Sequence, residues 1–257
     1  MAVIPSGVEE SLDVSGGTRD VSTSLDTTTR LLASLHVYHD DGGHSGAMSM
    51  ALDEALLEHA TVPSIRFYQW NSPALSFGYF GEFGEVAIHE CERDLVRRWT
   101  GGGIVFHGDD LTYSIVIPAN DAAFDESSML IYKKVHCALC TALNEVGKRA
   151  VVIGSARCAD RTPQRGVPTN NCFANPVHAD VMLNGRKIAG AAQRRTRRGL
   201  LQQGSIQGVD LENDLAERFA RALSVNCSER QMSKEVLDRA RELAQQKYGA
   251  DFWLRMR

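Results

Sequence analysis

The chain has 257 residues, of which 43% are apolar, and its formal net charge is −4 at pH 7. This composition supports one sizeable buried core and gives no reason to expect nucleic acid as a partner. No run approaches the roughly 20 apolar residues that a membrane span needs, so we expect no membrane partner. We find no secretory signal pattern, and the six cysteines are dispersed. Reduced thiols in a cytoplasmic protein are therefore expected.

Residues 1–30 differ in composition from the rest of the chain. They are rich in Ser, Thr, Asp and Gly, and their acidic residues outnumber Arg19 and Arg30. Such a composition cannot bury enough apolar surface to fold, and its acidity argues against a mitochondrial transit peptide. We therefore predict a disordered polar extension over 1–30 and one catalytic domain over 31–257.

The first predicted helix follows this extension. Met48, Leu52, Ala55 and Leu56 lie on one helical stripe of the stretch SGAMSMALDEALLEH. Four short strands are then expected, with the turn Asn71-Ser72-Pro73 between the first two. They are SIRFYQW (64–70), ALSFGYF (74–80), GIVFH (103–107) and LTYSIVIP (111–118).

The second half continues the alternation of helices and hairpins. Residues 126–147 are predicted to be a helix, with an apolar stripe formed by Ile131, Val135, Ala138, Ala142 and Val146. Two strands flank Asn184-Gly185, a pair typical of a tight hairpin turn. A last helix begins at a predicted cap, Ser233. Strands and hairpins that cluster between helices favour an α+β fold with a mixed, mostly antiparallel sheet flanked by helices.

Three adjacent glycines, Gly101 to Gly103, precede the strand that ends at His107. A loose hairpin loop would explain them, because glycine runs commonly mark turns. Close approach of a ligand to the backbone is the alternative. The chain has no phosphate-loop pattern and no GxGxxG that opens a helix, so ordinary nucleotide folds do not account for the run. His107 itself fits either a ligand-facing group or a structural histidine.

Two further residues are candidates for chemistry. Lys187 lies in the apolar, small-residue strand RKIAGAAQ, which favours a lysine directed into a site over a solvated one. Cys172 lies in the polar stretch TNNCFANPVHAD, where a nearby cation such as Lys187 would activate its thiolate. Cys137 and Cys140 form a C-x-x-C on the predicted helix, but no second pair accompanies them, so core packing is favoured over a metal site.

These pieces together resemble one family. RRWTGGGIVFHGDDLTYSIVIP, NGRKIAGAAQRR and LLQQGSI resemble, in order, the signatures of the biotin/lipoate A/B protein ligase family, over about residues 31–210. The resemblance implies a mixed antiparallel sheet with flanking helices and the handling of an octanoyl or lipoyl group. It implies catalytic roles for Cys172 and Lys187 and no metal ligand. The substrate contacts that it implies are Ser76, Gly78, Arg98, Thr100, Gly101, Gly102, Gly103, His107, Gly190 and Ala191.

Two chemistries occur in the family that the chain resembles. Ligases activate a free acid with ATP and magnesium, whereas octanoyltransferases use a thioester and need no cofactor. The stretch NNCFANPVHADVMLNGRKIAG resembles the cysteine-using octanoyltransferases. That reading implies an acyl group passed from acyl carrier protein, through Cys172, to a lysine of a lipoyl domain or the glycine-cleavage H protein. Lys187 would act as an oxyanion-type donor. The arginines at 194, 195, 197 and 198 would steer an acidic partner.

The chain also departs from the family pattern at two positions. Gln203 stands where the family often has His, and Gly108 follows His107 where Asp is common. If the absent histidine were a needed base, activity would be reduced. A catalytically weakened relative that binds acylated partners therefore stays open beside the ATP-dependent ligase. Biotin as the substrate is less favoured, because no N-terminal DNA-binding region accompanies the cysteine motif.

Overall fold

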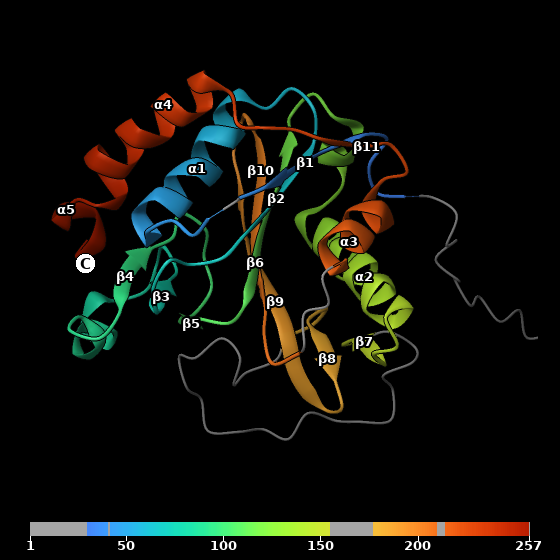
Figure 1. Ribbon diagram of the computed structural model, residues 1–257, viewed down its shortest axis with the longest axis horizontal. Helices are drawn as coiled ribbons and strands as arrows, with labels where there is room; N and C mark the ends of the chain where they lie inside the picture. Colours follow the sequence, from blue (N-terminus) through green and yellow to red (C-terminus); the bar gives the residue numbers. More distant parts are fainter. Residues whose placement is uncertain (1–29, 41, 155–176, 210–213, 257) are drawn as a thin grey trace, which may run out of the picture.

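A computed structural model describes residues 30–40, 42–154, 177–209 and 214–256 (Figure 1). Within these ranges, one sheet of eight strands forms the centre of the fold, in the order β11-β1-β2-β6-β10-β9-β8-β7. The pairings of β1 with β2 and β11 are parallel, and the others are antiparallel. The strands are β1 (Leu35–His39), β2 (Ser64–Tyr68), β6 (Leu111–Pro118), β7 (Ala150–Val152), β8 (Val181–Leu183), β9 (Arg186–Arg195), β10 (Gly199–Ile206) and β11 (Cys227–Glu229). The expected α+β class with a mostly antiparallel sheet is confirmed.

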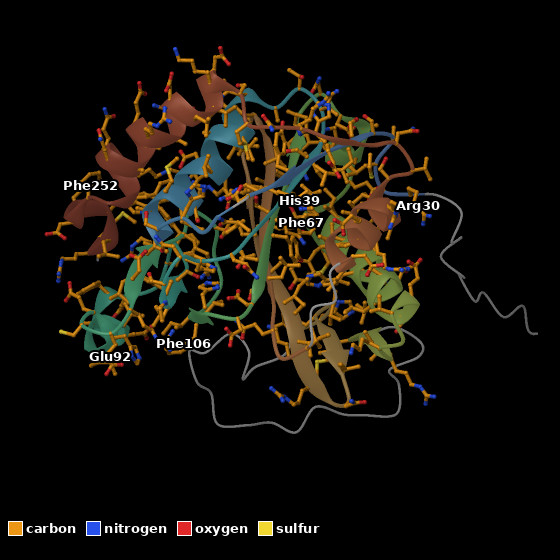
Figure 2. The ribbon with its side chains drawn as sticks, viewed as in Figure 1. Arg30, His39, Phe67, Glu92, Phe106 and Phe252 are labelled. Carbon is orange, nitrogen blue, oxygen red and sulfur yellow. The ribbon has the colours of Figure 1, made fainter. Side chains whose placement is uncertain are left out.

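Helices cover both faces of this sheet. Figure 1 shows α1 (Gly46–His59) and α4 (Lys234–Leu243) over one face, and α2 (Ser128–Glu145) and α3 (Leu215–Leu223) over the other. Successive side chains of a strand point to opposite faces, so β6 feeds both cores. Ile115 packs in the core under α2 and α3, whereas its neighbour Val116 packs under α1 and α4. Figure 2 shows His39 and Phe67 side by side on neighbouring strands, where their rings stack 5.5 Å apart.

The helix α1 is buried almost all round, because α4 covers the side that faces away from the sheet. Leu52, Ala55 and Leu56 of the predicted stripe are buried, and so are the charged residues Asp53 and Glu54. The helix begins after Ser45, whose side chain accepts a hydrogen bond from the backbone of Met48. A charged residue buried this deeply requires partners, which the chain supplies at the candidate site.

The other predicted helices are also present, with shifted ends. The predicted helix 126–147 is α2, which begins after its cap Ser127. Val146 of the predicted stripe lies just after the last helical residue and is only partly buried. Ser233 caps α4 as predicted. The last predicted helix then widens into a π-helical turn, η5 (Ala244–Tyr248), before α5 (Asp251–Leu254). Short 3₁₀ turns are η1 (Phe83–Glu85), η2 (Ala87–His89) and η3 (Ala122–Asp125).

A second, three-stranded sheet stands beside the first. It consists of β4 (Asp94–Arg97), β3 (Ala74–Phe77) and β5 (Val105–His107), in that order. The two strands expected around Asn71-Ser72-Pro73 therefore both exist, but β2 joins the large sheet and β3 the small one. The pairing of β3 with β4 is parallel and that with β5 antiparallel. Residues of the small sheet and residues of β9 and β10 consequently line one pocket together.

Buried Arg97 joins the small sheet to the C-terminal segment. Its guanidinium donates hydrogen bonds to the backbone carbonyls of Tyr79, Gly81, Trp253, Leu254 and Met256. The indole of Trp253 donates in return to the carbonyl of Arg97 at 3.0 Å. The carbonyls at the end of α5, which have no partners within the helix, are thereby satisfied.

The hairpin of β8 and β9 turns at Asn184-Gly185, as predicted. Both residues have positive φ, 50° and 80°, which the twist of a tight hairpin requires. The register shifts between Val181 and Met182, so β8 carries an irregularity just after Asp180. Among the described residues, no helix is long and apolar enough to cross a membrane. The prediction for residues 1–30 concerns positions that, apart from Arg30, lie outside the described residues.

Candidate active site

A narrow pocket of about 30 Å³ lies where the two sheets meet. Its walls come from β3 and β5 of the small sheet, from β2, β6, β9 and β10 of the large sheet, from α1 and from the loop after β4. Six of the predicted substrate contacts line it together: Ser76, Arg98, Gly102, His107, Gly190 and Ala191. A larger open hollow of about 760 Å³ lies beside the β5–β6 turn and the hairpin turn, and contains none of these six.

Arg98 holds the glycine loop in place from inside. One guanidinium nitrogen donates to the carbonyls of Gly101 and Gly103 at 3.1 and 2.8 Å, and the other donates to Ser76 Oγ at 2.6 Å. Gly102 has a φ of +86°, which favours glycine. Gly78 directly follows the neighbouring strand β3, and an added Cβ there would lie 2.1 Å from the Gly102 carbonyl oxygen. Gly78 therefore permits the close approach of this loop to β3.

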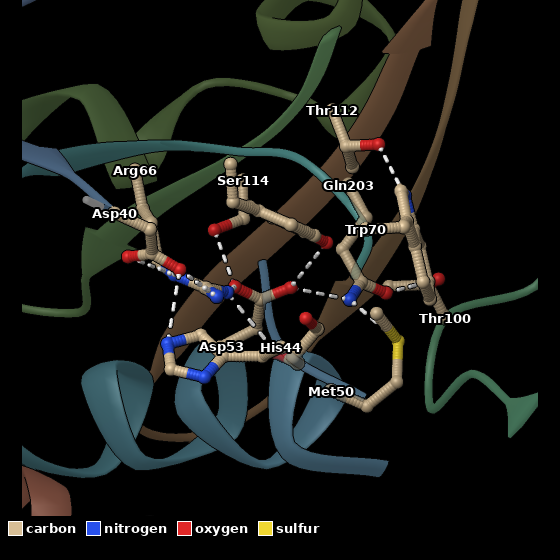
Figure 3. A network of polar contacts seen from close by, with 12 residues as sticks. Asp40, His44, Met50, Asp53, Arg66, Trp70, Thr100, Thr112, Ser114 and Gln203 are labelled. Atoms are coloured by element: carbon tan, nitrogen blue, oxygen red, sulfur yellow. Dashed lines mark hydrogen bonds and ion pairs between the residues drawn. The ribbon is translucent and has the colours of Figure 1, made fainter. Parts of the chain in front are cut away.

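Thr100 and Gln203 join the glycine loop to buried Asp53 (Figure 3). The Thr100 hydroxyl donates to Gln203 Oε1, and Gln203 Nε2 donates to Asp53 Oδ2, both at 2.7 Å. The amide of Gln203 thus has both a donor and an acceptor role in the core. Gln203 also lines the pocket, so this departure from the pattern that the sequence resembles faces the candidate site.

Asp53 is itself part of a buried charge network, also visible in Figure 3. Arg66 lies between Asp53 and Asp40, at 2.7 and 2.6 Å, and Ser114 donates to Asp53 at 2.6 Å. Burial opposes the charge of Arg66, but the two carboxylates raise its pKa above the usual value. Buried charges that are fully paired are costly to break, because one partner would remain without compensation.

His107 lies at the pocket wall between a hydroxyl and a carboxylate. Its Nε2 is 2.7 Å from Ser76 Oγ, and its Nδ1 is 2.8 Å from Asp110 Oδ2. The ring stacks on Trp70, with ring centroids 4.1 Å apart. Burial lowers the pKa of His107, although Asp110 opposes this change. The carboxylate that is missing at position 108 is thus supplied to the imidazole by Asp110.

Lys187 is buried behind the β9 wall of the pocket. Its Nζ lies 2.7 Å from Asp180 Oδ2, and both side chains are at most 1% exposed. At Gly190, which lines the pocket, an added Cβ would lie 2.7 Å from this Nζ. The absence of a side chain at Gly190 therefore lets the ammonium group stand against the pocket wall. Lys187 is therefore buried rather than solvated, and it lies behind Gly190 without itself lining the pocket.

Asp180 is held in place by the Tyr132 hydroxyl and by the backbone of Val177. The Tyr132 hydroxyl donates to Asp180 Oδ1 at 2.7 Å and accepts from the backbone of Ala191 at 3.1 Å. Burial, with Asp180 next, raises the pKa of Tyr132, which keeps its hydroxyl protonated as a donor. Ala179, just before Asp180, has a φ of +70°, an unfavourable conformation for a residue with a side chain. Its carbonyl lies 2.6 Å from Nδ1 of buried His136.

The cysteines and arginines named from the sequence have different outcomes. Cys172 lies outside the described residues. Cys140 is buried in the core, with Cys137 packed against it, as predicted, and burial raises the pKa of the Cys140 thiol to about 12. Three of the four arginines expected to steer a partner have contacts within the chain: Arg194 lies over Tyr79 and Trp99, Arg195 contacts the loop after η3, and Arg198 is 3.4 Å from Glu58.

Comparison with known proteins decides the family. The lipoyl protein ligase A/B catalytic domain matches residues 45–247. The chain belongs to this family. Two curated relatives are each named octanoyltransferase LipM. That of Symbiobacterium thermophilum is 30% identical, covering 89% of this chain and 98% of its own length. That of Bacillus subtilis is 28% identical, covering 83% and 95%.

Solved structures of the lipoyl ligase family share the fold. A bipartite lipoate protein ligase from an archaeal lipoylation system of Thermoplasma acidophilum aligns with a TM-score of 0.65 at 20% identity, over 88% of this chain and 97% of that one. Lipoate-protein ligase A bound with ATP aligns with a TM-score of 0.67 at 21% identity, over 87% and 98%. At these identities, the likeness establishes the fold of this family member.

Asp110, Tyr132 and Asp180 are among the residues of the site that were not predicted from the sequence. Asp110 had a readable signal, since it follows His107 by three residues in HGDD, directly after a strand. Asp180 is the one acid of the predicted hairpin that contains Lys187, which is a weaker signal. Tyr132 had none, because its position on α2 is typical of core packing.

Proposed function

We propose that the chain is a protein octanoyltransferase. In this proposal it takes an octanoyl group from an acyl carrier protein thioester and passes it, through an acyl-enzyme on Cys172, to a lysine of a lipoyl domain or of the glycine-cleavage H protein. The curated relatives that align over most of this chain are octanoyltransferases. The single structural observation that carries the proposal is the buried ion pair of Lys187 and Asp180 against the pocket wall.

Lys187 suits the stabilisation of charge on an acyl carbonyl. Thioester attack places negative charge on the carbonyl oxygen, and a fixed donor in a water-poor site stabilises that charge strongly. Lys187 is 1% exposed, and Asp180 fixes the direction of its ammonium group. The same positive group would favour the thiolate of a cysteine that approaches it, which is the nucleophilic form.

The acyl chain requires the pocket to widen. A cavity of about 30 Å³ holds about one or two water molecules, far less than an eight-carbon chain. The walls at Val105, Ala191 and Ala192 are small or apolar side chains that suit an alkyl chain. We therefore place the acyl chain between β5 and β9, with its carbonyl end toward Lys187.

The described carboxylates give little support to a magnesium-ATP site. A ligase would need carboxylate oxygens for magnesium. Among the described residues, buried Asp53 beside the pocket already accepts from Arg66, Ser114 and Gln203. Asp110 and Asp180 are two further buried carboxylates there. Protein donors engage both: His107, Thr112 and Ser205 at Asp110, and Tyr132, Lys187 and the Val177 backbone at Asp180. Transfer from a thioester to an amine runs downhill without ATP, so the transferase needs no such site.

The test compares two donors against one acceptor. A lipoyl domain is incubated with the protein and octanoyl-acyl carrier protein without ATP, and in parallel with octanoate or lipoate, ATP and magnesium. We expect acylation of the acceptor, read by intact mass, in the first reaction only. Acylation in the second reaction alone would establish the ligase instead, and acylation in neither would favour a binding relative.

A further inference from the structure

Ser76, His107 and Asp110 form a continuous chain of hydrogen bonds that opens onto the pocket. Ser76 lies on β3 and His107 ends β5, the antiparallel neighbour of β3. Ser76 Oγ is 2.7 Å from His107 Nε2, and Asp110 Oδ2 is 2.8 Å from Nδ1. Ser76 and His107 both line the pocket. The order hydroxyl, imidazole, carboxylate is the one in which a hydroxyl passes its proton to histidine.

The partners of His107 determine which of its ring nitrogens carries the proton. A carboxylate only accepts, so the proton of neutral His107 is on Nδ1 and faces Asp110. Nε2 is then an acceptor, and Ser76 donates its hydroxyl hydrogen to it. Arg98 donates to Ser76 Oγ at 2.6 Å, which leaves the hydroxyl hydrogen for His107. The basic nitrogen of His107 therefore reaches the pocket through Ser76.

The carboxylate of Asp110 is held by three donors besides His107. They are the Gly108 backbone, Thr112 Oγ1 and Ser205 Oγ, at 3.0, 2.9 and 2.7 Å. This support fixes the imidazole in one orientation and one tautomer. Buried His136 makes a useful contrast: its nitrogens face the Ala179 carbonyl and the Tyr113 hydroxyl, and it does not line the pocket.

We propose that Ser76, His107 and Asp110 form the proton relay of the transfer step, with His107 as the general base for the acceptor lysine. This inference rests on the proposed octanoyl transfer. The neutral amine of the acceptor attacks the carbonyl carbon of the thioester, a C–N bond forms, and the C–S bond breaks with its electron pair on sulfur. Ser76 receives the amine proton as its own proton passes to Nε2. His107 then returns the proton to the thiolate or to water.

The relay supplies the base that the sequence seemed to lack. Gln203, where the family often has histidine, is an amide and cannot accept a proton at neutral pH. It is also committed to Thr100 and Asp53. His107 lines the same pocket and is a neutral base in this environment, since burial lowers its pKa. A general base of this kind contributes about 100-fold or more to a transfer rate.

The charged groups around His107 predict how substitutions would shift the pH dependence of transfer. Asp110, from the β5–β6 turn, raises the pKa of His107, whereas Arg98, after β4, and Arg93, before β4, lower it. Arg93 donates to the backbone carbonyl of His107 at 3.1 Å and does not line the pocket. If His107 is the base, the rate falls at acid pH as the imidazole takes a proton. Asp110→Asn must then move this fall to lower pH, and Arg93→Met to higher pH.

The experiment measures the pH dependence of octanoyl transfer from octanoyl-acyl carrier protein to a lipoyl domain, first with the wild-type protein. Octanoyl loading of the enzyme is followed separately by intact mass. We expect His107→Gln and Ser76→Ala to transfer about 100-fold more slowly while loading changes by only a few fold. Asp110→Asn should shift the acid limb, the fall of the transfer rate at acid pH, to lower pH, and Arg93→Met should shift it to higher pH. His59→Gln, which removes a histidine at the end of α1 whose ring contacts the Ala55 carbonyl away from the pocket, should leave the position of the acid limb unchanged.

Three outcomes separate the two claims. Transfer at the wild-type rate by His107→Gln overturns the relay. An acid limb that stays in place in both Asp110→Asn and Arg93→Met also overturns it, even if His107→Gln does not fold. Absence of any transfer by the wild-type protein overturns the proposed function, and the relay with it.

Discussion

Asp180 Oδ2 lies 2.7 Å from Lys187 Nζ, with both side chains almost completely buried in the hairpin of β8 and β9. Tyr132 on α2 contacts the other carboxylate oxygen at 2.7 Å. The pair is thus held from both the sheet and the helix layer, and its ammonium group stands against the pocket at Gly190. Under the proposed function, the pair would contribute both to stability and to catalysis.

A double-mutant cycle distinguishes these contributions. Asp180→Leu or Lys187→Met alone leaves one buried charge without its partner and should lower the free energy of unfolding by about 3–5 kcal/mol. The double variant removes both charges and should recover much of that loss. It should remain inactive, because no donor faces the acyl carbonyl. Chemical denaturation and the transfer assay measure the two effects, and an active double variant would contradict the catalytic role of Lys187.

Gly190→Ala should move the ammonium group of Lys187 without unfolding the protein. The added Cβ would lie 2.6 Å from Lys187 Cε and 2.7 Å from Nζ, so the end of a flexible side chain must move. We expect only a small change in stability but a transfer rate that falls about 100-fold, because a misplaced catalytic group is costly. Gly84→Ala is the control, since an added Cβ there has nothing within 4 Å. Equal rates in the two variants would remove Gly190 from this account.

Gln203→Leu tests the network under the glycine loop. The change removes the donor to Asp53 and the acceptor for Thr100, both buried. We expect the free energy of unfolding to fall by about 1–3 kcal/mol, the cost of unsatisfied buried polar groups. Thermal denaturation measures it. The exposed Gln245→Leu serves as the control, and a loss no larger than in that control would show that the network contributes nothing to stability.

The stability of the protein should also depend on pH through His136. Burial lowers the pKa of His136 to about 4, from an ordinary value of 6.5. Between pH 6.5 and about 4, the unfolded chain therefore binds a proton at His136 and the folded chain does not. The contribution of neutral His136 to stability is complete above pH 6.5 and is lost as the pH falls from 6.5 toward 4. The loss amounts to about 3 kcal/mol. Denaturation of His136→Gln at several pH values should show a free energy of unfolding that depends less on pH in this window. An unchanged pH dependence would contradict the assignment.

The secondary structure that could be predicted from the sequence is the part governed by local pattern. The stripe of Leu52, Ala55 and Leu56 and the cap at Ser233 both lie where the sequence predicted them. Asn184-Gly185 specified its turn through the positive φ that both residues adopt. These features depend on neighbours within a few residues, which a periodicity or a turn preference captures.

The separation of β2 from β3 was not predictable in this way. The two strands are close in sequence, yet β3 pairs in parallel with β4, some 20 residues later, and β2 with β6. The site depends on that separation, because it brings Ser76 and His107 of the small sheet against Gly190 of the large one. The glycine run drew attention to this region, but the contacts of Arg98 with its carbonyls required the fold.

The central claim is the covalent intermediate on Cys172, and peptide mapping of the octanoylated enzyme tests it most directly. The protein is loaded with octanoyl-acyl carrier protein in the absence of an acceptor, digested, and analysed by mass. The matched control for Cys172→Ala is Cys158→Ala, which removes the other cysteine between residues 155 and 176. The account predicts one octanoyl group on the peptide that contains Cys172, absent from Cys172→Ala and present in Cys158→Ala. Full transfer by Cys172→Ala, or an octanoyl group on another cysteine, would contradict it.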